Sequence, residues 1–204
     1  LMLALISEES QALRVVRVAL NDVDLMLGAR LAGEVTWKSQ KKAISLLYEY
    51  CAVNNQVISD RIKIEALSKT KSDEAVSILQ DIIEGESHST DVQYSATKAL
   101  GQISTAKAIA ALKEALSHPI WNIGYAVTEA AEEIGTEAAI PILRAALFHS
   151  DVSVRCNAVD VLSSIKSIST IPTLQQALRD ECGNVRKRAI RHLGKFRTKE
   201  TFAS

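Results

Sequence analysis

Histidine and cysteine are the side chains of this chain best suited to binding a metal ion or acting as nucleophiles. The seven residues of these two types are His88, His118, His149, His192, Cys51, Cys156 and Cys182. A protein metal site usually takes such ligands in close pairs, about two to five residues apart, and none of the seven has a His or Cys partner at that spacing. We therefore expect no bound metal, and structural or solvent-facing roles for these side chains.

Signatures of nucleotide and metalloenzyme chemistry are also missing. The sequence contains no Gly-x-x-x-x-Gly-Lys-Ser/Thr, no Gly-x-Gly-x-x-Gly and no His-Glu-x-x-His, so it lacks the phosphate cradle, the dinucleotide fingerprint and the zincin site. We expect no catalytic residues, no cofactor and a protein that is not an enzyme. The odd number of cysteines suits a reducing compartment, and no segment approaches the roughly 18 apolar residues of a membrane span. We expect a cytoplasmic protein that does not enter a membrane.

Charge is balanced overall but unevenly distributed. The chain has 24 Lys and Arg against 24 Asp and Glu, yet residues 119–160 carry a net charge of −4 and residues 161–204 a net charge of +6. The basic side chains near the end are Arg186, Lys187, Arg188, Arg191, Lys195, Arg197 and Lys199. They form either a solvated terminal cap or a docking patch, for which Arg186, Arg188 and Arg191 are the candidate contact residues. Aromatic residues that could stack on bases are sparse there, which disfavours nucleic acid.

Trp121 and Tyr125 are further candidates for partner contact. They lie four residues apart and so share one face of a helix, in a chain with only 4% aromatic residues. Trp and Tyr are favoured anchors of protein interfaces, but large side chains can equally fill the layer between two repeats. Both interpretations remain open.

The elements that position these residues are helices. Only 8 Gly and 3 Pro occur in 204 residues, too few turn formers for an all-β fold. Apolar residues recur with a step of 31: Ile109, Leu112 and Leu116 return as Ile140, Leu143 and Leu147, and again as Ile171, Leu174 and Leu178. A second stripe keeps the same step: Val92, Ala96, Leu100 and Ile103 return as Ile123, Val127, Ala131 and Ile134, and then as Val154, Ala158, Leu162 and Ile165. These spacings predict two amphipathic helices of about three turns per repeat.

Capping residues support this period. Asp91 and Asp151 are expected just before first helices, Gly101 and Gly135 near their ends, and Pro141 and Pro172 at the start of second helices. Upstream of Ser59 the period is lost, although residues 7–20, 22–35 and 38–53 still have helical patterns. We place the boundary between an irregular helical cap and the regular array at Asn54-Asn55.

A family resemblance rests on these repeats. The unit Asp151-Val-Ser-Val-Arg-Cys-Asn-Ala-Val-Asp-Val-Leu162, with second helices of the type Ala138-Ala-Ile-Pro-Ile-Leu143, resembles the short HEAT-like repeats of the phycobilisome-lyase type over about residues 54–198. Gln93 and Gly124 stand where that pattern usually has Arg, and Ser163 stands where it usually has Gly. The stretch at residues 22–35 is similar to a segment that precedes HEAT-like repeats in bacterial signalling NTPases of the NACHT type.

The resemblance implies an all-α, right-handed α-solenoid of four to five HEAT-like hairpins over residues 55–204, behind a helical cap over residues 1–54. It also implies a non-catalytic protein–protein recognition scaffold, the C-terminal sensing or docking region of a larger NTPase whose P-loop domain performs the chemistry. In this superfamily the second helices line the inner face, which makes Lys113, Arg144 and Gln175 candidate contact residues. The partner, the binding face and the oligomeric state stay open.

Two enzymatic alternatives belong to the same superfamily. A bilin lyase subunit would place a tetrapyrrole against Trp121 and Tyr125, but the Asn-His-Cys motif of the isomerising members is missing here. A HEAT-like DNA alkyl-base glycosylase would need a basic face around a Trp. The zero net charge of the chain and the acidic residues near Trp121 disfavour it.

Overall fold

The computed structural model describes residues 9–53 and 59–200, without the side chains of Trp37, Ala52 and residues 196–200. These residues form α-helices joined by short turns, and no strand occurs among them, so the all-α prediction is confirmed. The boundary expected at Asn54-Asn55 lies outside the described residues.

Twelve α-helices are found in the described part of the chain. Their bounds are α1 Glu9–Val18, α2 Leu25–Glu34, α3 Trp37–Val53, α4 Asp60–Thr70, α5 Asp73–Glu84, α6 Thr90–Ile103, α7 Ala106–Ala115, α8 Trp121–Ile134, α9 Ile140–Ala146, α10 Val152–Ser164, α11 Ile171–Ala177 and α12 Gly183–Glu200. A π-helical turn follows α1 at Ala19–Val23, and 3₁₀ turns precede α9 at Glu137–Ala139 and α11 at Ile168–Thr170. The second helices α9 and α11 are thus shorter than the three turns predicted, because a 3₁₀ turn forms the start of each.

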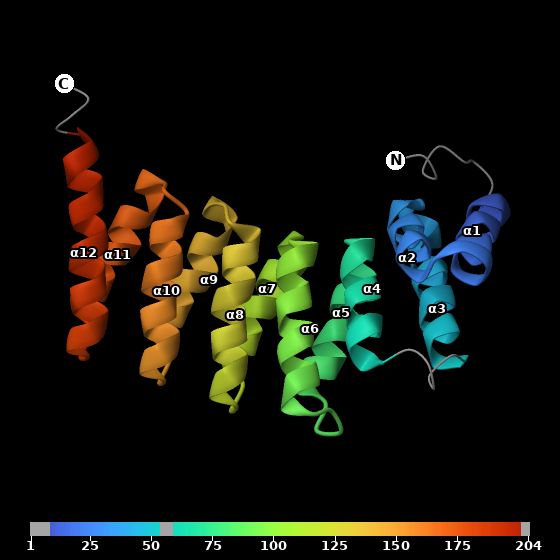
Figure 1. Ribbon diagram of the computed structural model, residues 1–204, viewed down its shortest axis with the longest axis horizontal. Coiled ribbons are helices and arrows are strands. Elements are labelled where there is room, and N and C mark those ends of the chain that lie inside the picture. Colours follow the sequence, from blue (N-terminus) through green and yellow to red (C-terminus); the bar gives the residue numbers. More distant parts are fainter. Residues whose placement is uncertain (1–8, 54–58, 201–204) are drawn as a thin grey trace. The chain divides into compact units, whose positions relative to one another are not determined.

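The chain divides into two compact units at Ala108–Ile109. In unit 1, which ends at Ala108, α2 packs against α3 and α4, and α6 packs against α4 and α5 (Figure 1). Ile44, Leu67 and Leu79 are buried in its core. At Gly33, an added Cβ would lie 1.8 Å from the carbonyl oxygen of Thr70, so only glycine permits α2 and α4 to approach this closely.

In unit 2, which begins at Ile109, the first helices α8, α10 and α12 lie side by side (Figure 1), with α10 in contact with both α8 and α12. The second helices complete the hairpins, since α9 packs on α8 and α10, and α11 packs on α12. Leu143, Val154, Leu162 and Leu174 are fully buried between them. These residues belong to the two apolar stripes that predicted the helices.

Helix starts agree with the sequence in part. Asp151 caps α10 as expected, because its side chain accepts hydrogen bonds from Ser153 N and Val154 N at 2.7 and 3.3 Å, and Pro141 and Pro172 occupy first-turn positions of α9 and α11. The prediction for Asp91 is wrong: α6 begins at Thr90, and Ser89 caps it. Ser at this position satisfies an orphan N–H as well as Asp does.

Four of the helices are followed by a residue with left-handed backbone conformation. These residues are Lys71 after α4, Ser104 after α6, Gly135 after α8 and Lys166, two residues after the last residue of α10, with φ between 49° and 63°. Gly135 is the only one of the four without a Cβ, and Gly101 lies inside α6 instead of ending it. A left-handed conformation costs about 1 to 2 kcal/mol for a residue that carries a Cβ, so three of the four hairpins carry a small backbone strain.

Candidate functional site

The turns between repeats in unit 2 are each held by one side chain. Nδ1 of His118 and Nδ1 of His149 accept hydrogen bonds from the backbone N–H two residues further on, at 3.2 and 3.0 Å. One repeat later, Oδ1 of Asp180 accepts from the corresponding N–H at 2.8 Å. This i to i+2 bond is the turn that short acceptor side chains stabilise. The three residues therefore share one structural role at a step of 31.

Arg155 connects two of these turns. Its guanidinium donates to the carbonyl oxygens of His149 and Ser150, both at 2.9 Å, and to the carboxylate of Asp180 at 2.8 and 3.3 Å. Nη2 also lies 3.1 Å from Glu181. The side chains of Arg155 and Asp180 are only 5% and 7% exposed. Burial acts to lower the pKa of Arg155, but the hydrogen bond to Asp180 and the charges of Asp180, Glu181 and Cys182 together raise it.

One repeat earlier, a glycine takes the place of this arginine. Gly124 in α8 is equivalent to Arg155 in α10, and His149 is equivalent to Asp180. An added Cβ at Gly124 would lie 2.6 Å from Nε2 of His149, so the imidazole occupies the space that a side chain at position 124 would need. Burial lowers the pKa of His149. The neutral imidazole of His149, packed against Gly124, thus stands where the next repeat has the Arg155–Asp180 ion pair.

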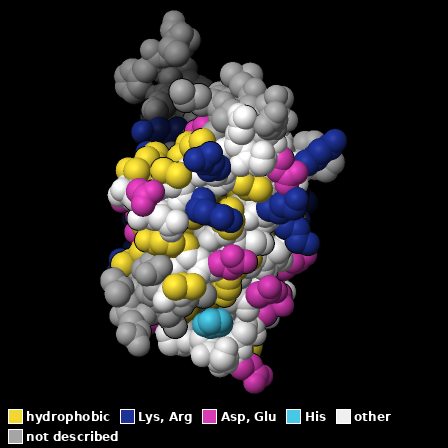
Figure 2. Space-filling model, turned by 90° about the vertical axis from the view of Figure 1, so that its right-hand side faces the viewer, with side chains coloured by type: hydrophobic (Ala, Val, Ile, Leu, Met, Phe, Trp, Pro, Cys, Tyr) yellow, Lys and Arg dark blue, Asp and Glu magenta, His cyan; other side chains and the backbone are white. Residues whose placement is uncertain are grey.

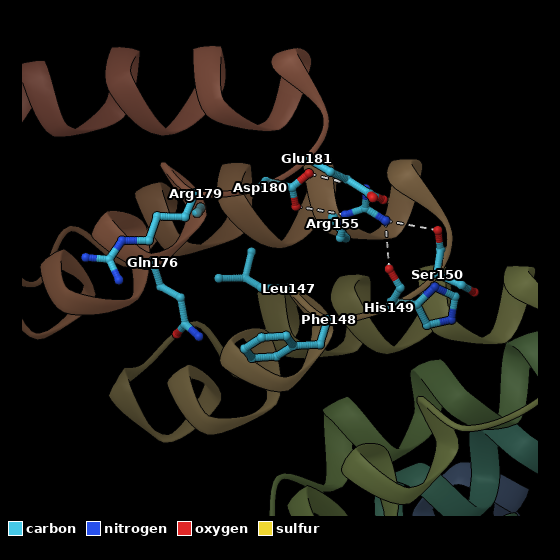
Figure 3. Close-up of a pocket in the computed structure, with 10 residues that line it drawn as sticks. Leu147, Phe148, His149, Ser150, Arg155, Gln176, Arg179, Asp180 and Glu181 are labelled. Carbon is cyan, nitrogen blue, oxygen red and sulfur yellow. Dashed lines mark hydrogen bonds and ion pairs between the residues drawn. The ribbon is translucent and has the colours of Figure 1, made fainter.

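A groove of about 520 Å³ opens beside the Arg155–Asp180 pair. We call it the α9–α11 groove, because most of its lining comes from those helices and the turns after them (Figure 3). Its lining residues are Leu147, Phe148, His149, Ser150, Arg155, Gln176, Ala177, Arg179, Asp180 and Glu181.

Phe148 and Arg179 are two of the exposed side chains that line the groove. Phe148 is 71% exposed, which is unusual for so large an apolar side chain. Arg179 is exposed, and its guanidinium forms no hydrogen bond or ion pair with the part of the chain that the structure describes. By contrast, Arg155 and Asp180 are held by each other. The groove therefore combines a rigid floor with an aromatic ring and a free cation.

The predicted second-helix contacts are all on the surface. Lys113 in α7, Arg144 in α9 and Gln175 in α11 are exposed at equivalent positions of successive repeats. None of the three belongs to the lining of the α9–α11 groove. Gln175 is next to Gln176, which does line it.

Trp121 and Tyr125 differ in exposure. Trp121 is the first residue of α8 and is 52% exposed. Tyr125 is half-buried, and its carbonyl oxygen accepts a hydrogen bond from Thr128 Oγ1 at 2.7 Å. Trp121 is thus positioned for surface contact, whereas part of Tyr125 contributes to packing.

The basic candidates of α12 bind other parts of unit 2. Arg186 donates to the carbonyl oxygens of Asp180 and Glu181 at 2.7 and 2.8 Å, which ties down the turn before its own helix. Arg188 forms an ion pair with Asp160, and Arg191 lies 3.5 Å from the same carboxylate. These three residues have intramolecular partners, which reduces the charge they offer to a docking partner.

His192 also contacts the carboxylate of Asp160. Its Nε2 is 2.8 Å from Oδ1 of Asp160, and its Nδ1 is buried without a hydrogen-bond partner among the described residues. Burial lowers the pKa of His192, and the charges of Lys195, Arg191 and Arg188 act in the same direction. His192 is therefore a neutral, structural side chain near neutral pH.

Phe148 and Arg179 were not among the predicted site residues. A signal for them exists in the repeat: Ser117, Phe148 and Arg179 are equivalent positions, so an aromatic and a cation stand where the preceding repeat has a small polar residue. Only the spatial proximity of consecutive turns makes the pair a site, and that proximity needs the fold.

No group of three or more His, Cys, Asp or Glu side chains in the described part of the chain could hold a metal ion. Across the described residues, none of the helices combines the length and the apolar character that crossing a membrane requires.

A family model for HEAT repeats matches residues 85–152 and 145–204, which together make up more than half of the chain. The chain belongs to the HEAT-repeat family. The predicted α-solenoid of HEAT-like hairpins is thereby confirmed. The turn residues described above lie within the matched HEAT repeats.

Solved structures were also found to be similar to this chain. Human deoxyhypusine hydroxylase in complex with glycerol is similar with a TM-score of 0.52 and 17% identity, over 91% of this chain and 84% of the hydroxylase. Two engineered proteins give TM-scores of 0.44 and 0.39, both at 19% identity. The first covers 92% of this chain and 97% of its own, and the second covers 89% and 57%. No curated protein matches the chain.

Proposed function

We propose that this HEAT-repeat chain is a non-catalytic protein-recognition scaffold and that the α9–α11 groove is one of its contact surfaces. The observation that carries the proposal is that two exposed side chains line one groove: the ring of Phe148, and the guanidinium of Arg179, which has no partner in the described part of the chain. Aromatic and arginine side chains dominate the energetics of protein interfaces when they meet in a pocket.

The polar groups of the groove floor favour recognition over chemistry. Arg155 and Asp180 are buried and hydrogen-bonded to each other, and both also bind the backbone of a turn. Groups held in this way give a rigid surface, and rigidity reduces the entropy that binding costs. An acidic side chain next to an apolar one in the partner would match Arg179 and Phe148.

We further propose that the chain is the sensing or docking region of a larger signalling NTPase of the NACHT type. The support is the similarity of residues 22–35, which include α2, to the segment that precedes HEAT-like repeats in such proteins. An immunoblot of source cells with an antibody against this chain tests the proposal. A band well above about 60 kDa is expected, since that mass accommodates several domains, and a band near 22 kDa would contradict it.

The recognition role is tested by comparing partner capture between variants. Phe148→Ser introduces the residue found one repeat earlier, and Arg179→Ser removes the free cation. Ile168→Ser is the matched control, because Ile168 is 72% exposed and lies outside the groove. Quantitative mass spectrometry of captured proteins should show partners that both groove variants lose and the control retains. Partners that all three variants capture equally would contradict the proposal.

A further inference from the structure

We propose that a second groove, between α3 and α5 in unit 1, binds a basic amphipathic helix of a partner protein. This α3–α5 groove has a volume of about 530 Å³. Its lining residues are Lys41, Ile44, Ser45, Tyr48, Glu49, Glu74, Ser77, Ile78, Asp81, Ile82 and His88. The inference goes beyond the proposed function, because it concerns the other unit and a partner of opposite charge.

The lining residues lie mainly in two rows, one on α3 and one on α5. On α3 the lining residues run from Lys41 to Glu49, and on α5 they run from Glu74 to Ile82, with steps of three and four residues in both rows. Such steps keep side chains on one face of a helix. Eight residues of helix extend about 12 Å, so the groove has room for about two turns of a guest helix.

The centre of the groove is apolar and only partly covered. Ile44 is 2% exposed and forms the floor, whereas Tyr48 is 50% exposed and Ile78 and Ile82 are half-buried. Figure 2 shows the side of the molecule on which α1–α3 lie, where hydrophobic side chains reach the surface between charged ones. Apolar side chains of a guest helix could cover this strip.

The charges around the strip determine which guest fits. Glu49, Glu74 and Asp81 are exposed, and their carboxylates bind no side chain or backbone group in the described part of the chain. Lys41 is the cation of the lining. Lys107, from α7, is engaged, because it donates to Ser77 Oγ at 2.7 Å and to the carbonyl oxygen of Asp73 at 3.1 Å.

Three carboxylates without a partner in the described part of the chain therefore flank an apolar strip, and His88 also lines the groove. An amphipathic helix lays its apolar face into such a groove and places its polar residues at the rim. Lys or Arg at the rim positions of the guest would meet Glu49, Glu74 and Asp81. The same carboxylates repel phosphate groups, which argues against a nucleic acid or an anionic lipid surface.

The test is a selection of random 14-residue peptides by display on the full chain, followed by fluorescence anisotropy with the selected peptides. We expect enrichment of peptides with Leu, Ile or Phe at i and i+4 and with Lys or Arg beside them. Glu49→Lys and Asp81→Lys should each weaken binding about five-fold, more at low salt, because rim ion pairs are partly screened. Tyr48→Ala should weaken it about ten-fold, as the loss of an anchor does.

Glu65→Lys is the matched control, since Glu65 is also an exposed acid and lies on α4 outside the groove. It should bind the selected peptides as the wild type does, and thermal unfolding should show that all variants fold. The proposal is overturned if no peptide is enriched, if the enriched peptides are acidic, or if the two reversals leave binding unchanged. Self-association of the chain that the same reversals abolish would overturn it too, because the occupant would then be a second copy.

Discussion

The repeats that begin with α8 and α10 have the same apolar skeleton and different polar parts. Val127 and Ala131 in α8 match Ala158 and Leu162 in α10 as buried positions of one stripe. Around this stripe the α8 repeat has Gly124 and Gly135, whereas the α10 repeat has Arg155 and Lys166 at the same places. The buried positions of the stripe thus stay apolar in both repeats, although the size of the side chain changes. The positions around them can exchange an ion pair for a histidine packed on a glycine.

Removal of the Arg155 guanidinium should change stability more than any other substitution that tests this comparison. We expect Arg155→Met to lower the free energy of unfolding by about 3 to 5 kcal/mol, because it leaves the buried carboxylate of Asp180 without its partner. Denaturant unfolding followed by circular dichroism measures this loss. Arg144→Met, at an exposed position, is the control and should stay within about 0.5 kcal/mol of wild type. Equal effects of the two substitutions would contradict the structural role of Arg155.

Conversion of the Gly124–His149 contact into a second Arg–Asp pair should have the next largest effect on stability. Gly124→Arg places a Cβ 2.6 Å from the His149 ring, so it should destabilise unit 2 by about 1 to 3 kcal/mol. With His149→Asp added, the new pair can copy Arg155 and Asp180, which are separated by the same 25 residues. A double-mutant cycle should therefore show favourable coupling of about 1 to 3 kcal/mol.

If the effects of Gly124→Arg and His149→Asp on the free energy of unfolding simply add, the new Arg–Asp pair has not formed, which would contradict this prediction. Gly124→Ala separates steric crowding from charge, because it meets the same imidazole without adding a guanidinium.

The ends of the two first helices offer a smaller test. Lys166 has a φ of 54° and Gly135 a φ of 63°, so glycine is suited to both positions. Lys166→Gly should stabilise the chain by about 0.5 to 1 kcal/mol, and Gly135→Ala should destabilise it by about 1 kcal/mol. Thermal unfolding of both variants measures the two signs. Destabilisation by Lys166→Gly would mean that the lysine makes a contact worth more than the strain.

The smallest expected change concerns pH. Burial lowers the pKa of His149 and His192, so the unfolded state binds their protons more readily than the folded state. Stability is therefore fully present above about pH 6.5, the ordinary value for histidine, and is lost as pH falls below it toward the folded-state pKa.

His149→Asn keeps an acceptor for the turn but removes the titrating ring, so unfolding measured between pH 7.5 and 5 should depend less on pH than in wild type. An unchanged pH profile would contradict this assignment. His192 continues to contribute in the variant, which leaves part of the dependence in place.

Helix positions and hairpin pairing in the repeat array were predictable because burial acts on every copy of a repeat. Ala96, Val127, Ala158 and Ala189 are all buried at the same position, and this regularity appears in the sequence as a step of 31. The capping residue of α6 was less predictable, because Ser89 and Asp91 can both accept from an orphan N–H. Local chemistry allowed both, but Ser89 holds the position that precedes a first helix in each repeat, as Ile120 and Asp151 do one and two repeats later.

The candidate sites depended on contacts between residues distant in sequence. Lys113, Arg144 and Gln175 were predicted to be exposed and are exposed. For Trp121 both surface contact and packing were open, and it is 52% exposed. In contrast, Arg186, Arg188 and Arg191 had the charge of a docking patch, but Asp160 and two carbonyl oxygens take up much of their hydrogen-bonding capacity. A list of charges does not say which ones already have partners.

The sequence by itself determined the helices, the repeat and the family. Periodic burial and helix capping depend on residues close together in sequence, and the same pattern recurs in each repeat. Only the tertiary structure decided that Phe148 and Arg179 line one groove and that Tyr48, Glu49 and Asp81 line another. The physical reason is that each groove is formed by helices and turns that come together only in the folded chain. The apolar and charged lining exists only when residues from different helices and turns become neighbours.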